Sequence, residues 1–456
     1  MTYQGDIRER LDPDHFLALR DADFQAIKSS VFPAKKLRRL STLVTKGESP
    51  LWRGDSFQDR GMPFLRGKNI KGEIDFDDIV HIPKDVHERM KRSVLNDDFF
   101  LLTIAGTLGD VAFFKKEYPE CNINQDIAKI KLTDEIAYEY AVLYFQTRFA
   151  KSQIKILSNG TTRGHLNFSQ VRSFDVIVPS PEIQNHIVEI IQSAYAQKRQ
   201  KAQEADALLD SIDGYVLAEL GIEMPAVEEK KCFVVSAGEI ERRFDPFYLR
   251  NIPYFRSIKT PYPLTPLGKL LIEKPQYGAN ERAINGNPET DIRYIRITDI
   301  HAYGNLLNDD WKTAENVDEK YKLEERDILF ATSGATAGKS FAYKTEFGKA
   351  ILAGYLIRFR FDETQINPLF VRYYTQTQIY KFWVRLIQRA AAQPNINAEE
   401  FKSFRIPLPP LEVQNRIVEE SQRRLSEAKK LSQEADAIVE AAKKEAERMM
   451  LEGASG

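Results

Sequence analysis

Near the end of each half of the chain, hydrophobic and polar positions alternate with the period of a long amphipathic helix. In the second half, small apolar residues recur at steps of three and four, which is the seam of a coiled coil: Ala428, Leu431, Ala435, Ile438 and Ala442. Glu445 interrupts this seam and Met449 resumes it. The positions about 230 residues earlier form a weaker seam: Lys198, Lys201, Ala205, Leu208, Ile212, Tyr215 and Glu219.

Proline-rich junctions, Pro179–Pro181 and Pro407–Pro410, precede both stretches. Proline cannot continue a strand ladder but fits the first turn of a helix, so each junction marks the start of a helix. The pattern predicts helices over residues 181–222 and 410–451, each about 55–60 Å long at 1.5 Å per residue. Two such seams in one chain predict an antiparallel coiled coil; the alternative is a pair of solvated linkers.

Outside these helices the pattern changes to short strands mixed with helices. Residues 98–104 and 327–331 are apolar runs that lead into glycine-containing turns, which is typical of buried strands. Residues 127–132 and 356–361 alternate apolar and polar positions with period two, which predicts half-buried strands. The globular parts of the chain are therefore predicted to be α+β domains.

The same order of motifs occurs twice, at a spacing of about 230 residues, which indicates an internal duplication. The matching pairs are Arg10–Pro13 with Arg243–Pro246, Phe64–Ile70 with Tyr294–Ile300, Thr103, Thr107 and Gly109 with Thr332, Thr336 and Gly338, Gln184–Glu189 with Gln414–Glu419, and Gln203–Ala207 with Gln433–Ala437. Matches of this kind in one register exclude coincidence. The alternative to a shared function is a duplicated domain with a purely structural role.

The duplication predicts two tandem domains related by a pseudo-two-fold. We place the globular domains at residues 1–180 and 223–409, a first spacer helix at 181–222, and a second spacer helix with the tail at 410–456. A chain of 456 residues also exceeds the ~250–300 residues at which one hydrophobic core stops growing. Pseudo-symmetry of this kind suits a ligand with its own repeat, such as duplex DNA.

Composition narrows the class of protein. Hydrophobic residues make up 43% and charged residues 29% of the chain, which fits a folded globular protein rather than a disordered one. Cys121 and Cys232 are the only cysteines and no paired Cys/His spacing occurs, so neither a disulfide framework nor a metal site is predicted. The chain shows no signal-like or membrane-spanning apolar run, so we expect a cytoplasmic protein without a membrane partner.

Four motifs carry a resemblance to a known family: Arg243–Tyr248 (RFDPFY), Tyr294–Ile300 (YIRITDI), Ser333–Lys339 (SGATAGK) and Ile406–Val418 (IPLPPLEVQNRIV). Their order, together with the alternation of globular domain and long helix over nearly the whole chain, resembles the specificity subunit of type I restriction-modification systems. The first copy departs from this pattern, because Asp110 stands where the second copy has Lys339.

The resemblance implies that the globular parts are target recognition domains, each of which reads one half of a bipartite site in double-stranded DNA. It implies that the paired helices space these domains and dock two modification subunits, the methyltransferases that methylate adenine at N6. A restriction (translocase) subunit joins them for cleavage. S-adenosylmethionine, ATP and magnesium are then expected on the partner subunits, and no cofactor is expected on this chain.

A net charge of −1 means that any DNA-binding surface must be local. Two matching windows, residues 140–174 and 364–398, contain no Asp or Glu, as contact with phosphates requires. Their basic residues are Arg148, Lys151, Lys155, Arg163 and Arg172 in the first window and Arg372, Lys381, Arg385 and Arg389 in the second. The alternative is that these windows are ordinary solvated helix faces.

Candidate DNA-binding residues lie in three places. They are the loops within these windows, the segments that lead into and include the Arg66 and Arg296 motifs, and the turns rich in Thr and Gly. Arg can bridge guanine O6 and N7, and Asn or Gln can pair with adenine. The candidates are Arg53, Arg66, Lys68, Thr107, Thr161, Arg163, His165, Tyr277, Arg296, Thr298, Thr336, Lys339, Arg389 and Gln393. Both base-reading and phosphate-holding roles remain open for each.

No catalytic motif is complete, so we predict a recognition subunit that is not itself an enzyme. The run Ser333–Ser340 is one residue too short for a P-loop, and a strand is predicted to follow it instead of a helix. Asn367–Phe370 departs at Leu369 from the motif with which adenine methyltransferases hold a flipped base. Two rival functions stay open: the specificity subunit of a fused type II restriction-methylation enzyme, and a duplicated coiled-coil adaptor that binds only protein.

Overall fold

The main sheet has the same strand order in both halves of the chain. In the first half it is antiparallel and runs β2-β9-β6-β7, with strands Ser41–Lys46, Ile127–Leu132, Phe99–Thr103 and Val111–Phe114. In the second half it is again antiparallel and runs β12-β19-β16-β17, with strands Gln276–Tyr277, Leu356–Phe359, Ile328–Ala331 and Ser340–Ala342. The predicted internal repeat and the α+β class are confirmed.

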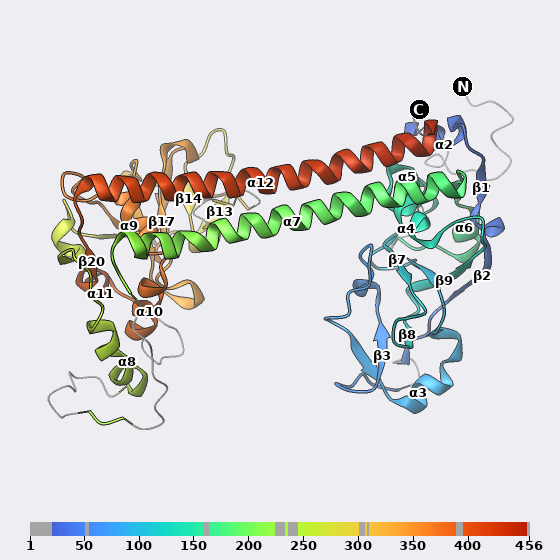
Figure 1. Cartoon of the computed structure of the whole chain (residues 1–456), viewed down its shortest axis with the longest axis horizontal. Helices are drawn as coiled ribbons and strands as arrows, with labels where there is room; N and C mark the ends of the chain where they lie inside the picture. Colours follow the sequence, from blue (N-terminus) through green and yellow to red (C-terminus); the bar gives the residue numbers. More distant parts are fainter. Residues whose placement is uncertain are drawn as a thin grey trace. The chain divides into compact units, whose positions relative to one another are not determined.

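The structure is a computed structural model that describes residues 21–50, 54–158, 164–223, 233–235, 245–300, 306–307, 310–388 and 395–453. The chain divides into two compact units. Unit 1 comprises Met1–Lys201 and Gln433–Gly456, and unit 2 comprises Ala202–Ser432. Each unit therefore contains one globular domain together with a part of each long helix (Figure 1).

Smaller sheets and short helices complete each globular domain. Unit 1 adds the sheet β4-β3-β8-β5, with strands Val80–Ile82, Met62–Leu65, Cys121–Ile123 and Val94–Leu95, and the pair β1 (Ala34–Lys36) and β10 (Asp175–Ile177). Its helices are α2 (Ala22–Ser29), α3 (Lys84–Arg89), α4 (Tyr138–Gln146), α5 (Arg148–Ser158) and α6 (Phe168–Ser173).

Unit 2 is built in the same way, with its smaller strands in pairs. These are β14 (Arg293–Ile295) with β18 (Ala350–Leu352), β13 (Ala283–Asn285) with β15 (Lys312–Ala314), and β11 (Leu264–Pro266) with β20 (Arg405–Pro407). Its helices are α8 (Pro246–Arg256), α9 (Pro368–Tyr374), α10 (Gln378–Ile387) and α11 (Ala398–Ser403). In both units the strand that leads into the Phe64–Ile70 or Tyr294–Ile300 motif (β3 or β14) pairs in parallel with the strand that precedes β9 or β19 in the chain (β8 or β18).

The strands with period-two patterns are central, not half-buried as predicted. β9 lies between β2 and β6, and its Lys129 is buried although the sequence pattern suggested an exposed face. The Lys129 ammonium donates to the Val94 carbonyl at 2.6 Å and lies over the Phe99 ring. Arg358 takes the matching place in β19, where its guanidinium donates to the Lys322 carbonyl and to Glu273. Each buried cation is compensated by hydrogen bonds to carbonyl or carboxylate oxygens, although the Arg358 Nε is left without a hydrogen-bond partner among the described residues.

The two long helices are α7 (Pro181–Glu219) and α12 (Leu411–Glu452), drawn in green and red in Figure 1. Both begin at the predicted proline junctions, and both lie close to the predicted bounds of 181–222 and 410–451. Within unit 1 the beginning of α7 packs with the end of α12, and within unit 2 the reverse holds. The predicted antiparallel pairing is confirmed. In the described part of the chain, no helix combines the length and the apolar character needed to cross a membrane.

The seam of α12 follows a strict seven-residue repeat. The buried positions of this repeat are Gln414, Ser421, Ala428, Ala435, Ala442 and Met449. The sequence pattern predicts an interruption at Glu445. In the structure the next residue, Ala446, is buried at this point of the helix. Likewise Val439 is more buried than Ile438, which the predicted seam contained. The reason is that the end of α12 also packs into the core of unit 1, so its buried face is wider than the seam between two helices.

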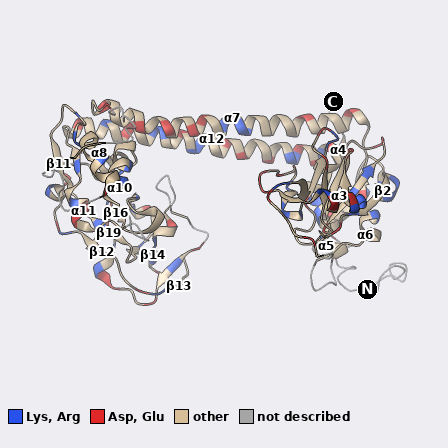
Figure 2. Cartoon of the chain, turned by 90° about the horizontal axis from the view of Figure 1, so that it is seen from below, with Lys and Arg blue, Asp and Glu red and all other residues tan. Residues whose placement is uncertain are grey.

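Ion pairs fill the polar part of the α7 seam. Lys198 and Lys201 are half-buried, and their ammonium groups lie 2.7 Å from Asp436 and 2.6 Å from Glu434 of α12. In unit 2 Arg416 pairs with Glu219 at 2.7 Å. Figure 2 shows acidic and basic residues interspersed along both helices. Charges at the edge of a coiled-coil seam select the register and direction of the partner helix more than they add stability.

Ala446→Leu is expected to destabilise unit 1, because Ala446 lies in its core and three extra carbons have no space there. Overpacking of this kind costs about 1–3 kcal/mol. The control is Ala441→Leu, the same change at an exposed position of the same helix, which should change stability by less than about 0.5 kcal/mol. Urea unfolding followed by circular dichroism measures both. Equal midpoints for the two variants would contradict the packing described.

Candidate nucleic-acid interface

In unit 1, backbone hydrogen bonds bring four separate segments to one edge of the main sheet. The turn between β6 and β7 begins at Ile104, whose N–H donates to the Asp126 carbonyl at 2.7 Å and whose carbonyl accepts from Leu166 at 2.9 Å. The Asn124 N–H, beside Asp126, donates to the Leu65 carbonyl at 3.0 Å. The end of β3, the β6–β7 turn, the β8–β9 turn and the residues that follow position 163 therefore form one surface.

Unit 2 repeats this arrangement with the matching segments. The Thr332 N–H donates to the Tyr355 carbonyl at 3.0 Å, and the Thr332 carbonyl accepts from the Ile396 N–H at 2.8 Å. The Ala353 N–H donates to the Ile295 carbonyl at 3.0 Å. The edge is thus formed by the end of β14, the β16–β17 turn, the β18–β19 turn and the residues that follow position 394.

In each unit, a glycine with left-handed backbone shapes the turn between two strands of the main sheet, the β6–β7 turn in unit 1 and the β16–β17 turn in unit 2. Gly109 (φ +93°) lies against α5 and Gly338 (φ +88°) against α10, where an added Cβ would come within 2.7 Å of Ile154 and 2.5 Å of Val384. Only glycine combines this φ with such a close approach. Strands β7 and β17 follow these turns, which agrees with the predicted strand and differs from the helix that a P-loop requires.

Several predicted DNA-binding residues lie at or beside this edge. Thr107 is exposed next to Gly67, whose added Cβ would lie 3.6 Å from the Thr107 Oγ1, and Ala105 forms a bridge with the exposed His165. In unit 2 Lys339 is exposed and makes no ion pair with the residues that the structure describes, and Thr336 lies beside it, half-buried. Arg53, Thr161, Arg163, Arg389 and Gln393 lie outside the described residues.

Tyr277 joins the same edge through a backbone contact. Its ring is 48% exposed, and its hydroxyl oxygen accepts from the Ala398 N–H at 3.1 Å, at the start of α11. Asn397 begins this helix with a capping box that includes Glu400, and Asn167 with Gln170 begins α6 in the same way. The capping boxes fix where the loop before each helix ends.

Arg66 and Lys68 share one carboxylate. Both side chains form ion pairs with Asp78, and the Arg66 guanidinium also donates to the Asp78 carbonyl at 3.1 Å. The hydrogen bond from Lys68, together with the charge of Arg66, lowers the pKa of Asp78. Because both cations already bind Asp78, a phosphate contact by either one requires it to leave this carboxylate or to share it.

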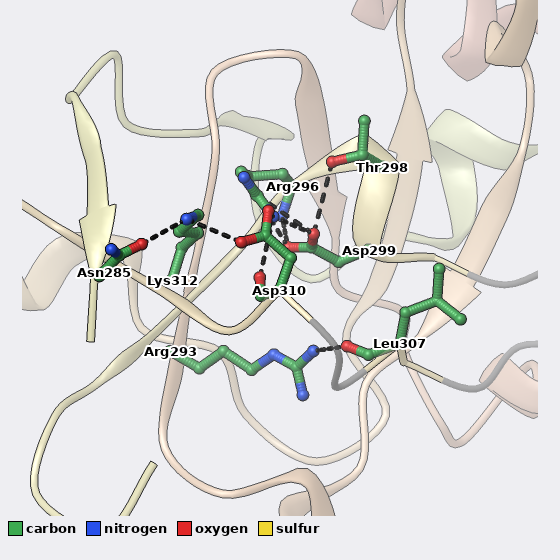
Figure 3. Close-up of polar contacts among 8 residues, drawn as sticks. All are labelled: Asn285, Arg293, Arg296, Thr298, Asp299, Leu307, Asp310 and Lys312. Atoms are coloured by element: carbon green, nitrogen blue, oxygen red, sulfur yellow. Dashed lines mark hydrogen bonds and ion pairs between the residues drawn. The ribbon is translucent and has the colours of Figure 1, made fainter. Parts of the chain in front are cut away.

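Arg296 is held more tightly than its counterpart Arg66. Its guanidinium lies 2.6 Å from Asp299 and 3.0 Å from Asp310, and Lys312 binds Asp310 from the other side at 2.7 Å (Figure 3). These hydrogen bonds, chiefly that with Asp299, raise the pKa of Arg296. Thr298 is exposed, and its hydroxyl donates to Asp299 at 3.4 Å. A phosphate contact by Arg296 therefore requires displacement of a carboxylate.

The acid-free windows form α4, α5 and α6 in unit 1 and α9, α10 and α11 in unit 2, and not all of their cations face solvent. Arg148 pairs with Asp23 and Glu447 at 3.2 and 3.1 Å. Arg372 is 7% exposed, and burial lowers its pKa to about 10. The expectation of a free cation is thus wrong for these two residues, because Arg148, although exposed, is paired with two carboxylates and Arg372 is buried.

The exposed cations of the windows form a matching pair in each unit. Lys151 and Lys155 lie one turn apart on the exposed side of α5, and Lys381 and Arg385 occupy the same places on α10. Residues four apart on a helix share a face, so each pair presents two charges together. The sequence named these residues in its windows but offered no means to separate them from Arg148 and Arg372.

Tyr355 is a residue of the interface that the sequence did not suggest. Its side chain is 65% exposed, and its backbone holds the β16–β17 turn through Thr332. Asp126 takes the matching position in unit 1 and accepts hydrogen bonds from Asn124 and Gln125. The only feature of the sequence that could have pointed to Tyr355 is its position directly before the strand β19. Tyr355 and Lys339 in unit 2, against Asp126 and Asp110 in unit 1, give the two edges different chemistry.

The chain has two α+β domains joined to long paired helices. Each domain presents a similar edge, built from turns and carrying Thr, Gly and basic residues. This arrangement defines a class of protein with two similar binding surfaces. A family model described as type I restriction modification DNA specificity domain matches residues 35–208 and 279–426, more than half of the chain and both copies of the repeat. The chain belongs to this family.

A related protein of Methanocaldococcus jannaschii, described as the type I restriction enzyme MjaX specificity subunit, is 36% identical over 107 residues. The aligned segment covers 22% of this chain and 24% of the relative. A solved structure from work on complex assembly and conformational transition of the type I R-M system covers 92% of this chain and 96% of its own, with 13% identity and a TM-score of 0.57. The second similarity shows that the fold is shared.

Gly338→Ala is expected to destabilise unit 2 more than Gly334→Ala. Both positions have positive φ, which costs an L residue about 1–2 kcal/mol, but an added Cβ at Gly334 meets no atom within 4 Å. At Gly338 the contact with Val384 adds overpacking, about 1–3 kcal/mol more. Thermal unfolding of the two variants under one condition measures the difference. A Gly338→Ala protein as stable as Gly334→Ala would show that the turn does not pack on α10 as described.

Proposed function

We propose that this chain is the DNA sequence-specificity subunit of a type I restriction-modification enzyme. In this proposal the chain recognises a bipartite target in double-stranded DNA and positions two adenine-N6 methyltransferase (modification) subunits and a restriction subunit on it. The observation that carries the proposal is that the family model matches both copies of the repeat. Each copy presents the same edge, assembled from segments far apart in sequence.

The chemistry of the edges supports a role in binding DNA. Exposed Thr, Lys and Arg side chains, with glycine turns that let the backbone approach, are suited to phosphates and base edges. Lys68, Lys339 and the paired cations of α5 and α10 are assigned to phosphates, since they are exposed. Thr107, His165, Tyr277 and Tyr355 lie at the edges and are assigned to the base-reading surface.

In this proposal the two units read different base sequences. The edge of unit 2 carries Lys339 and Tyr355 where the edge of unit 1 carries Asp110 and Asp126. A carboxylate such as that of Asp126 only accepts hydrogen bonds, as from the cytosine amino group, whereas the Tyr355 hydroxyl can also donate. Two half-sites with different sequences therefore follow from the side chains at matching positions.

The chain itself performs no covalent step in this proposal, and it acts in the cytoplasm. S-adenosylmethionine, ATP and magnesium belong to the modification and restriction subunits. The family match favours a type I system over the fused type II enzyme, because the matching model is that of the type I specificity domain. The rival adaptor function, binding of protein alone, leaves the exposed cation pairs of α5 and α10 without a role.

The proposed function is tested by expressing the chain with its neighbouring genes and mapping N6-methyladenine by sequencing. We expect one bipartite motif, two short blocks separated by a gap of unspecified bases, and its disappearance when this chain is deleted. A methylome that does not change on deletion would refute the proposal. A motif made of one continuous block would refute the assignment of one half-site to each unit.

Lys339→Ala is expected to weaken DNA binding by the assembled methyltransferase without changing the motif. Loss of one phosphate contact should reduce the slope of log K against log salt by about 0.9. The control is Lys344→Ala, at the other end of β17, where the ammonium already pairs with Glu346 at 3.2 Å. Binding titrations between low and high salt measure both slopes. An unchanged slope for Lys339→Ala would remove this residue from the interface.

A further inference from the structure

Side chains of the long helices bind the N-terminal ends of helices in the globular domains, twice in each unit. In unit 1, Gln184 of α7 accepts from the Ala137 N–H at the start of α4, and Glu447 of α12 accepts from the Arg148 N–H at the start of α5. In unit 2, Gln414 of α12 accepts from the Asn367 N–H before α9, and Asp213 of α7 accepts from the Gln378 N–H that begins α10. Each globular domain is thus capped from both long helices.

The two glutamines are buried and fully hydrogen-bonded. Gln184 is 2% exposed, and its amide also donates to the carbonyls of Glu135 and Pro179, both at 3.0 Å. Gln414 is 0% exposed and donates to the carbonyls of Gln365 and Pro409 at 3.2 and 2.8 Å. A buried amide with three satisfied contacts allows one orientation of the domain, because any rotation leaves a polar group unpaired.

The two carboxylates reach the same point from different positions of the repeat. Asp213 corresponds in the repeat to Lys443, and Glu447 corresponds to Leu217. The acceptor distances are 3.2 Å for Asp213 and 3.1 Å for Glu447. Because the residues differ while the contact recurs, duplication alone does not account for it. A carboxylate also suits a helix N-terminus, where the helix dipole is positive.

The capped helices α5 and α10 lead from the long helices to the candidate interface. α10 carries the exposed Lys381 and Arg385, and its Val384 packs under the left-handed Gly338, next to Lys339. In α5, Ile154 packs under Gly109 in the same way. A shift of either helix at its capped end therefore moves the turn at its other end.

We propose that Gln184, Glu447, Gln414 and Asp213 are positioning residues that fix the direction in which each recognition domain presents its DNA-binding edge. This inference rests on the proposed function. They touch no DNA themselves; they hold the domain in one orientation on the helix segments of its own unit. A bipartite target with a fixed gap requires such a fixed orientation, since a domain free to tilt would accept half-sites at several distances.

The first test measures the cap in the full chain by amide hydrogen exchange. Asp213→Ala should speed exchange in the first turn of α10 by about 5–30-fold, the range for loss of a helix cap, while α4 and α5 keep their rates. The matched control is Asp210→Ala, which removes an exposed carboxylate one turn earlier on α7 and should change nothing in α10. Equal exchange in both variants would overturn the capping role of Asp213.

The second test asks whether the caps set the gap. The probes are duplexes with the two mapped blocks at the natural gap and at gaps one base pair longer and shorter, bound by the complete methyltransferase. Asp213→Ala and Glu447→Ala should lower the preference for the natural gap by about 5–30-fold. Both blocks should be read unchanged. Asp210→Ala and Glu440→Ala, which remove exposed carboxylates of the same helices, should keep the natural preference.

A purely structural role predicts a different result, in which stability falls and gap preference stays. An unchanged gap preference in Asp213→Ala and Glu447→Ala would therefore overturn the inference and leave the proposed function intact. Asp213→Asn, which retains an acceptor oxygen, should restore most of the preference, and it also serves if Asp213→Ala folds poorly. If the wild-type complex recognises no bipartite target at all, the proposed function fails and this inference with it.

Discussion

Each globular domain buries the apolar sides of both long helices in its own core. Ile187, Ile191 and Ala194 of α7 share one core with Val439 and Met449 of α12, together with residues of β6, β9 and α4. In unit 2 the core contains Ile212 and Val216 of α7 and Ile417 of α12. Fully burying one such aliphatic side chain stabilises the fold by about 1.5–3 kcal/mol. Helices this rich in charge form little structure alone, so the domains and helices stabilise one another.

The same packing explains why the charges of this chain are arranged as they are. Some charged residues of α7 and α12 lie at the edges of the seam, where ion pairs such as Lys201 with Glu434 favour the antiparallel register. At the candidate interface the acid-free windows leave exposed cations on α5 and α10, so a chain of net charge −1 still presents positive surfaces. Arg296 differs from these exposed cations, because its guanidinium is paired with Asp299 and Asp310. These ion pairs stabilise the turn after β14.

The repeat makes two similar edges, and single substitutions make them chemically different. The glycines, the strand order and the backbone hydrogen bonds of the edge recur in both units, because they are conditions of the fold. Lys339 against Asp110, and Tyr355 against Asp126, are side chains that the fold leaves free to vary. This separation lets one architecture present two distinct surfaces.

By itself, the sequence determined the duplication, the α+β class, both long helices with their starts at the prolines, and the glycine turn that leads into a strand. These features depend on local periodicity and on proline and glycine geometry, which act between residues near in sequence. Only the tertiary structure decided which cations are paired with carboxylates: Arg148 and Lys151 lie in one helix and one window, but Arg148 pairs with Asp23 and Glu447. It also revealed Tyr355 and the carboxylate caps of Asp213 and Glu447, because these contacts join residues far apart in sequence, at positions that the repeat does not match.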